Sequence, residues 1–114
     1  MTVLAVVEHD RGTMTSASLG VLTAARNLAK QMTTKFEALT IGANADRLSE
    51  TVANFGATTV HQAHNAMLTD FGPEAWGESI AQVVRKISPS VVIGTGTERG
   101  HEIIAQAAAR LDLP

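Results

Sequence analysis

A loop rich in glycine and threonine has the composition most typical of a ligand site in this sequence. Residues 94–100 read Gly-Thr-Gly-Thr-Glu-Arg-Gly and stand between an apolar run and a helical pattern. Glycines let a ligand approach the backbone, hydroxyls donate hydrogen bonds, and a helix N-terminus favours an anion. The loop is therefore a candidate phosphate or nucleotide cradle, or else a tight strand-to-helix turn that needs glycine for its geometry. The candidate binding residues are Gly94, Thr95, Gly96, Thr97, Arg99 and Gly100.

Two common nucleotide-binding motifs do not fit this loop. A dinucleotide-binding fingerprint follows the first strand and has two residues between its last glycines, whereas three stand between Gly96 and Gly100. A P-loop requires Gly-Lys-Ser or Gly-Lys-Thr, which the sequence lacks. We therefore expect neither a dinucleotide site nor a P-loop here.

The triplet Glu8-His9-Asp10 ends the first apolar run and faces the same crevice. A carboxylate beside an imidazole can perform acid–base chemistry. Neighbours along a strand point to opposite faces, however, so Glu8 and His9 need not meet, and loop capping or a domain contact is the simpler interpretation. An enzyme that uses Glu8, His9 or Arg99 remains an alternative. Because no Gly-x-Ser-x-Gly elbow is present, we expect no catalytic residues.

The remaining histidines and the single tryptophan have structural interpretations. His61 and His64 flank the end of an expected strand, where their spacing does not suit a metal, and no third ligand is near, so no metal site is predicted. His101 and Glu102 open the expected last helix, where an acidic residue suits the helix dipole. Trp76 is expected to pack in the core of the molecule, with an interface role as the alternative.

The composition limits the class of protein. A chain of 114 residues forms one domain, residues 1–114, since domains typically have about 100–150 residues. With 45% hydrophobic and 18% charged residues the chain is globular, and a net charge of −2 argues against nucleic-acid or anionic-membrane partners. The absence of cysteine excludes a disulfide scaffold, a thiolate metal site and a cysteine nucleophile. Without a signal or membrane-spanning segment, we expect a soluble, cytoplasmic protein.

Short apolar runs alternate with helical periodicities along the whole sequence. The first run, Val3 to Val7, is continuous and β-branched, as in a strand buried on both faces. A polar loop is expected from His9 to Met14, followed by a helix capped by Thr15 or Ser16. The expected strands are 3–7, 36–41, 58–63 and 91–93, and the later helices are centred on 48–55 (stopped by Gly56), 73–87 (started by Pro73) and 103–111.

Strand–helix units repeated in this way predict an open parallel sheet, the doubly wound α/β class. The first and fourth strands are the most apolar and should be central neighbours, whereas the polar third strand should lie at an edge. The expected strand order is therefore 3-2-1-4. This order leaves one side of the apolar fourth strand open, which is an aggregation hazard. Either another segment covers that edge, or the chain is part of a longer one.

Two stretches resemble electron transfer flavoprotein alpha subunits. Residues 3–10, ending in Glu-His-Asp, and residues 15–28, with an inner Leu-Thr-Ala-Ala, resemble the opening of those subunits. Residues 97–100, Thr-Glu-Arg-Gly, followed by Ala-Ala-Ala-Arg-Leu at 107–111, resemble the later signature of the same domain. The resemblance spans essentially the whole chain. It departs at Ala105-Gln106, where the family usually has Pro-Arg, and at His101, where another basic residue is common.

The resemblance implies the N-terminal, nucleotide-binding-like domain of an alpha subunit. In that family this domain packs on the beta subunit, which binds a structural AMP, while most contacts to FAD lie in the C-terminal part of the alpha subunit. The heterodimer carries electrons from acyl-CoA and other dehydrogenases. The chain is then a scaffold that has no catalytic residues and no FAD-binding residues of its own, and the FAD domain is absent.

A second interpretation is a stand-alone adenine-nucleotide-binding module of the universal-stress-protein kind. Such modules share the alternating element order and bind ATP beside the first and fourth strands. Their usual glycine spacing differs from that of Gly94, Gly96 and Gly100. Binding of AMP or ATP to the lone chain discriminates between the two interpretations.

Overall fold

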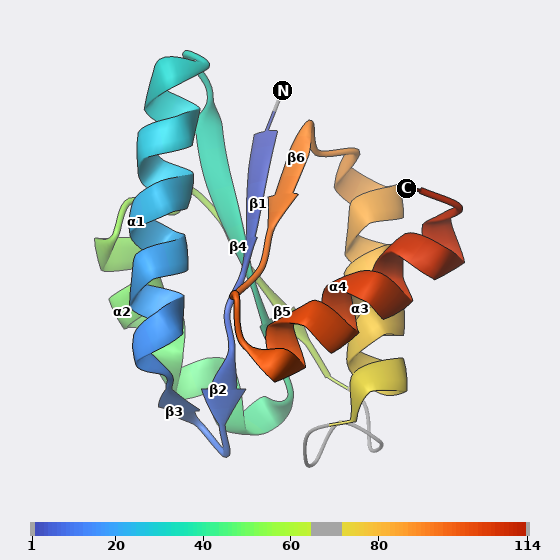
Figure 1. Cartoon of the computed structure of the whole chain (residues 1–114). Helices are drawn as coiled ribbons and strands as arrows, with labels where there is room; N and C mark the ends of the chain where they lie inside the picture. The colour runs from blue at the N-terminus through green and yellow to red at the C-terminus, as the bar shows by residue number, and fades with distance from the viewer. Residues whose placement is uncertain (1, 65–71, 114) are drawn as a thin grey trace.

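A computed structural model describes residues 2–64 and 72–113 of the chain. It contains a parallel sheet with helices on both faces (Figure 1). The strands lie in the order β5-β4-β1-β6, which is the predicted order 3-2-1-4, so the doubly wound α/β fold is confirmed. The strands are β1 (Thr2–Val6), β4 (Lys35–Ile41), β5 (Val60–Ala63) and β6 (Val91–Ile93).

The central strand β1 is buried on both faces, as its continuous apolar sequence predicts. Alternate side chains belong to two separate clusters because successive residues of a strand point to opposite faces. Val3 and Ala5 pack in the cluster that contains α1, and Leu4 and Val6 pack in the cluster that contains α3 and α4. One strand therefore supplies the centre of two hydrophobic cores.

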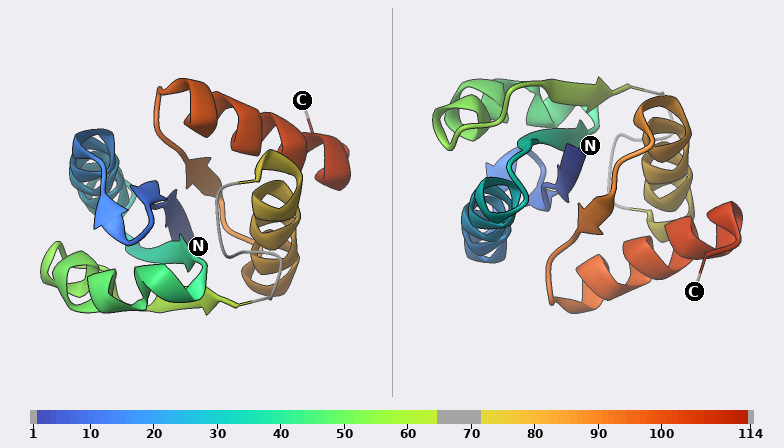
Figure 2. Two further views of the ribbon diagram at one scale, coloured as in Figure 1. Left: turned by 90° about the horizontal axis from the view of Figure 1, so that it is seen from below. Right: turned by 90° about the horizontal axis from the view of Figure 1, so that it is seen from above.

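In the part of the chain that the structure describes, α-helices cover both faces of the sheet. Figure 2 shows α1 (Ser16–Gln31) and α2 (Ser49–Asn54) on one side of the sheet, with α3 (Pro73–Ile87) and α4 (Glu98–Leu111) on the other. The hydroxyl of Thr15 caps α1, one of the two predicted caps, and Pro73 occupies the first turn of α3 as predicted. None of the helices formed by residues 2–64 and 72–113 has the length and apolar character that crossing a membrane requires.

Residues 9–14, predicted as a loop, form a small hairpin instead. Strand β2 (His9–Asp10) pairs antiparallel with β3 (Thr13–Met14). The two residues between them, Arg11 and Gly12, have φ values of 50° and 87°. Two successive positive φ values are what a two-residue hairpin turn of the primed type requires. The hairpin is too short for an alternating pattern to predict it.

Two helix boundaries also differ from the prediction. The segment expected to form one helix around residues 48–55 consists of a 3₁₀ helix, η1 (Ala43–Leu48), followed by α2. The last helix begins at Glu98 rather than at His101, so Glu98 supplies the acidic side chain of its first turn. The real start of α4 therefore lies inside the glycine- and threonine-rich loop.

Candidate functional site

The loop after β6 meets the residue that follows β1 at the carboxyl ends of the strands. In open α/β sheets ligands bind in this crevice. The hydroxyls of Thr95 and Thr97 each donate a hydrogen bond of 2.6 Å to Oε1 of Glu8, and the two hydroxyl oxygens are 2.9 Å apart. Glu8 is only 6% exposed. The structure thus joins two of the predicted loop residues to Glu8, across more than 80 positions of sequence.

The backbone of Glu8 is hydrogen-bonded as well as its side chain. Its N–H donates to Oγ of Ser18 at 2.7 Å, and the hydroxyl of Ser18 donates back to the Glu8 carbonyl oxygen at 2.8 Å. Ser18 is fully buried in the first turn of α1. Glu8 therefore links the N-termini of α1 and α4 at the centre of the sheet.

This arrangement places a carboxylate at the loop for which the sequence left two interpretations open, an anion cradle or a tight strand-to-helix turn. Thr97 is the N-cap of α4, and its hydroxyl oxygen also accepts from the N–H of Gly100 at 3.0 Å. A negative charge is favourable at a helix N-terminus. The carboxylate of Glu8 takes the hydroxyl donors that a phosphate would otherwise use. We call Glu8, Ser18, Thr95 and Thr97 the closed end.

Close packing explains two of the three loop glycines. A Cβ atom on Gly100 would lie 2.1 Å from the carbonyl oxygen of Thr95, and one on Gly94 would lie 2.7 Å from Cγ1 of Ile104. A Cβ atom on Gly96 would meet nothing within 4 Å. The glycines at 94 and 100 thus fit a tight strand-to-helix turn, and only at Gly96 is the backbone open to approach.

Arg99 lies outside the closed end. Its Nη1 is 3.8 Å from Oδ1 of Asp10, and both side chains are largely exposed. This ion pair connects the hairpin to the start of α4. Arg99 and Asp10 therefore sit beside the crevice rather than in it.

His9 points away from Glu8 and has its own partners. Its Nδ1 accepts from the N–H of Gly12 at 2.9 Å, and its Nε2 donates to the carbonyl oxygen of Ile41 at 2.6 Å. These partners assign the proton to Nε2, since a backbone N–H can only donate and a carbonyl oxygen can only accept. The ring lies against Trp76 with centroids 5.2 Å apart, and both residues are buried, which confirms the packing interpretation of Trp76. His9 fastens the hairpin to the end of β4.

The histidines at the other edge of the sheet each pair with a different carboxylate. Nε2 of His61 is 2.6 Å from Oε1 of Glu37, and that of His64 is 2.7 Å from Oδ1 of Asp46. Nζ of Lys35 also lies 3.5 Å from Glu37. Burial alone raises the pKa of Glu37, but the His61 hydrogen bond and the nearby charges outweigh it and lower this pKa below its usual value. Across residues 2–64 and 72–113, no group of three metal-ligating side chains is present.

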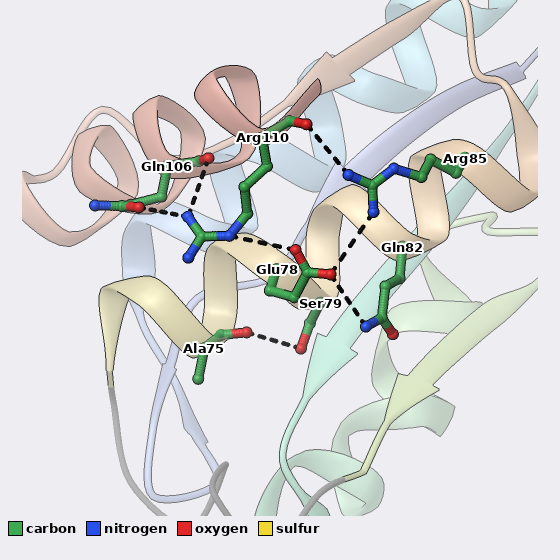
Figure 3. A network of polar contacts seen from close by, with 7 residues as sticks. All are labelled: Ala75, Glu78, Ser79, Gln82, Arg85, Gln106 and Arg110. Carbon is green, nitrogen blue, oxygen red and sulfur yellow. Dashed lines mark hydrogen bonds and ion pairs between the residues drawn. The ribbon is translucent and has the colours of Figure 1, made fainter. Parts of the chain in front are cut away.

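A polar network joins α3 to α4 on the face of the sheet opposite α1 (Figure 3). Oε1 of Glu78 is 3.3 Å from Nε of Arg110, while its Oε2 is 3.6 Å from Nη1 of Arg85 and accepts from Gln82 at 3.2 Å. The two helices approach closely at Gly77, where an added Cβ atom would clash with Cβ of Gln106. These contacts hold α4 across α3.

A groove of about 520 Å³ runs beside this network, between α3 and the end of β5. Its charged rim includes Glu78 and Arg110, which already neutralise each other. His64, Glu74 and Lys86 also line the groove, so its rim carries groups of both charge types. The sequence did not predict it, because its walls come from separate elements.

The comparisons with known proteins agree with this architecture. The family model of the electron transfer flavoprotein domain matches residues 3–114. The chain belongs to the electron transfer flavoprotein domain family. The resemblance to alpha subunits drawn from the motifs is thereby confirmed.

Curated relatives extend this assignment. The chain is 27% identical over 104 residues to an electron transfer flavoprotein subunit alpha of Thermoanaerobacterium thermosaccharolyticum, covering 91% of this chain and 32% of the relative. It is 25% identical to the subunit alpha of Clostridium acetobutylicum (91% and 31%) and 23% identical to Protein FixB of Azorhizobium caulinodans (92% and 29%). The chain spans about a third of the length of these relatives.

The sequence indicated the loop of residues 94–100 but did not predict that Glu8 would accept hydrogen bonds from it. Thr95 and Thr97 were singled out as donors to a ligand, whereas they donate to Glu8. The pair of Glu37 with His61 was also missed. An acidic residue inside an otherwise apolar strand was the available signal, because a buried carboxylate requires a partner.

Proposed function

We propose that this chain is the N-terminal scaffold domain of an electron transfer flavoprotein alpha-type subunit. It has no catalytic residues of its own in this proposal. Family membership over residues 3–114 and the alpha-subunit names of two relatives support the assignment. The relatives are about three times as long, which leaves room for a separate flavin-binding part.

The observation that carries the proposal is the buried carboxylate of Glu8 in the crevice. The diphosphate of FAD needs hydrogen-bond donors and positive charge. Here the two threonine hydroxyls already donate to Glu8 and are not available to a diphosphate. These residues do not fit a flavin diphosphate, so we place the FAD site elsewhere in the polypeptide and interpret the loop of Gly94 to Gly100 as a structural turn.

The partner in this proposal is a beta-type subunit that carries AMP. The scaffold domain packs on that subunit and positions the flavin-binding part, in a cytoplasmic heterodimer that carries electrons from dehydrogenases such as acyl-CoA dehydrogenases. The protein contribution to such chemistry is binding and orientation, while the flavin supplies the electron transfer.

The test measures two properties of the chain, its association with a beta-type subunit and its flavin absorbance. The chain is mixed with a beta-type subunit from the same organism and examined by analytical ultracentrifugation, and its visible spectrum is recorded alone after desalting. We expect a one-to-one complex and a colourless chain. Flavin absorbance retained by the lone chain, or failure to associate, contradicts the proposal.

A further inference from the structure

His9 is a buried anchor of the hairpin formed by β2 and β3. Figure 1 shows this hairpin after the end of β1, beside the start of α1. Two strands of two residues each have little stability of their own, since even longer isolated hairpins are marginally stable in water. The hairpin therefore depends on the contacts that tie it to the rest of the chain.

The contacts of His9 differ from other contacts of the hairpin in their burial. The ion pair of Asp10 with Arg99 spans 3.8 Å between two largely exposed side chains. Nε of Arg47, an exposed residue, donates to the carbonyl oxygen of Gly12 at 3.0 Å. Water and salt weaken such exposed contacts. His9 is only 5% exposed, so its hydrogen bonds are shielded from water and hold the hairpin more strongly.

The two ring nitrogens of His9 bind different parts of the chain. Nδ1 accepts from the N–H of Gly12 in the hairpin turn, and Nε2 donates to the carbonyl oxygen of Ile41 at the end of β4. Only the neutral ring with its proton on Nε2 forms both bonds, because an imidazolium ring has two donors and no acceptor. A proton added at Nδ1 faces the N–H of Gly12, donor against donor. Protonation therefore removes the bond to the turn and keeps the bond to Ile41.

Charged and titratable side chains surround this anchor on several elements. They are Glu8 before the hairpin, Asp10 and Arg11 in it, Asp46 and Arg47 in η1, Glu74 in α3 and Arg99 in α4. Arg47 lies over the turn, where its Nη2 would be 3.1 Å from a Cβ atom on Gly12. A second positive charge on His9 is thus placed close to the guanidinium of Arg47, and this repulsion also favours release of the turn.

The contact with Trp76 confines the effect of protonation to the hairpin. The two rings have centroids 5.2 Å apart and planes inclined by 32°. Trp76 belongs to the core cluster that contains Leu4 and Leu39. Because an aromatic face attracts a cation, the protonated ring of His9 can stay against Trp76 and bonded to Ile41. The turn is then released while the core stays packed.

We propose that His9 is a proton-sensitive switch of the hairpin. The neutral ring fixes the turn at Gly12, and the protonated ring releases it while the strands of the parallel sheet stay paired. Histidine is the side chain that ordinarily changes its charge between about pH 5 and pH 8. Release of the turn also loosens the contact of Asp10 with Arg99 beside the crevice. The inference does not depend on the proposed scaffold function.

Amide hydrogen exchange measured by NMR tests the switch in the wild-type chain. Protection factors, which correct for the intrinsic pH dependence of exchange, are determined between about pH 8 and pH 5 for the N–H of Gly12. The control is the N–H of Val7, which donates to the carbonyl oxygen of Leu39 within the sheet at 3.0 Å. We expect the protection of Gly12 to fall at least about ten-fold toward acid pH and that of Val7 to stay constant. The ring nitrogen resonances of His9 should change with the same midpoint as the protection of Gly12.

A matched pair of variants separates His9 from the other titratable groups. In His9→Asn the side-chain amide oxygen takes the place of Nδ1 and accepts from Gly12 at every pH in this range. The protection of Gly12 should then be independent of pH. The control His101→Gln removes an exposed histidine of α4 and should keep the pH dependence of the wild type.

The other outcomes overturn the inference for different reasons. Constant protection of Gly12 while His9 gains its proton shows that the ring does not hold the turn. Equal losses at Gly12 and Val7 show that acid unfolds the whole domain. A loss that persists in His9→Asn assigns the effect to another group, such as His64, which pairs with Asp46 in η1. If His9→Asn does not fold, the wild-type midpoints decide, since different midpoints for the His9 ring and for Gly12 also contradict the switch.

Discussion

Val91–Ile93 of β6, together with Ile104, Ala105 and Ala108 of α4, form an apolar surface that we call the open edge. The closed end and the open edge are joined by the loop after β6, yet they are opposite in character. At the closed end the polar side chains bond to one another: Thr95 and Thr97 donate to Glu8, and Ser18 bonds to the Glu8 backbone. At the open edge the side chains are apolar and half-buried, and the outward backbone groups of β6 have no strand beside them among the described residues.

The difference separates two kinds of binding. A small ligand with phosphate groups would bind at the strand ends, and that place is filled by the protein's own carboxylate. A polypeptide segment would bind along a strand edge by backbone hydrogen bonds, and among residues 2–64 and 72–113 no strand pairs with the outer edge of β6. This difference supports the proposed scaffold role.

The largest expected effect tests the tight turn at the closed end. The variant Gly100→Ala puts a Cβ atom 2.1 Å from the backbone of Thr95, so the turn must shift. We expect it to lower the free energy of unfolding by about 3 kcal/mol in urea titration, although alanine is the better helix former. The control Gly96→Ala meets nothing within 4 Å and should change it by less than about 0.5 kcal/mol. Equal losses would disprove the packing explanation.

The next effect concerns the carboxylate itself. Replacing Glu8 with alanine removes the acceptor that Thr95 and Thr97 share, and only one of the two hydroxyls can then donate to the other. A loss of about 2 kcal/mol is expected in the same titration. Glu8→Gln keeps an oxygen that accepts both hydroxyls and should cost about half as much. If the two variants are equally stable, the hydrogen bonds do not hold the closed end.

A smaller effect is expected at the opposite edge of the sheet, where His61 of β5 pairs with Glu37 of β4. Because the pKa of Glu37 is lowered in the folded state, its contribution is present above the unfolded value near 4.5 and is lost as the pH falls below it. The stability difference between the wild type and Glu37→Gln should therefore be constant above about pH 5.5 and shrink toward pH 3. Glu50→Gln, at an exposed position of α2, is the control, and chemical denaturation over this pH range is the measurement.

The smallest effect is expected at the exposed ion pair beside the closed end. Asp10 is 66% exposed and 3.8 Å from Arg99. Asp10→Asn should lower the free energy of unfolding by less than about 0.5 kcal/mol, and added salt should remove the difference. A loss of stability as large as that of Glu8→Ala would show that the ion pair of Asp10 with Arg99 contributes as much as the closed end.

The sequence predicted what depends on local patterns. The apolar run from Val3 to Val7 predicted the two-sided central strand, and Thr15 and Pro73 marked the starts of two helices correctly. The hairpin at residues 9–14 escaped prediction because strands of two residues have no period. The contact of Glu8 with Thr95 could not be predicted either, since it depends on which strands become neighbours in the folded sheet.

Titration calorimetry of the purified 114-residue chain with AMP, ATP and FAD tests the central claim most directly. The account predicts no saturable binding by the wild type at ligand concentrations up to about 1 mM, because Glu8 occupies the donors of the crevice. Micromolar binding of AMP or ATP would contradict it and favour a stand-alone nucleotide-binding module, and micromolar binding of FAD would place the flavin site in this domain.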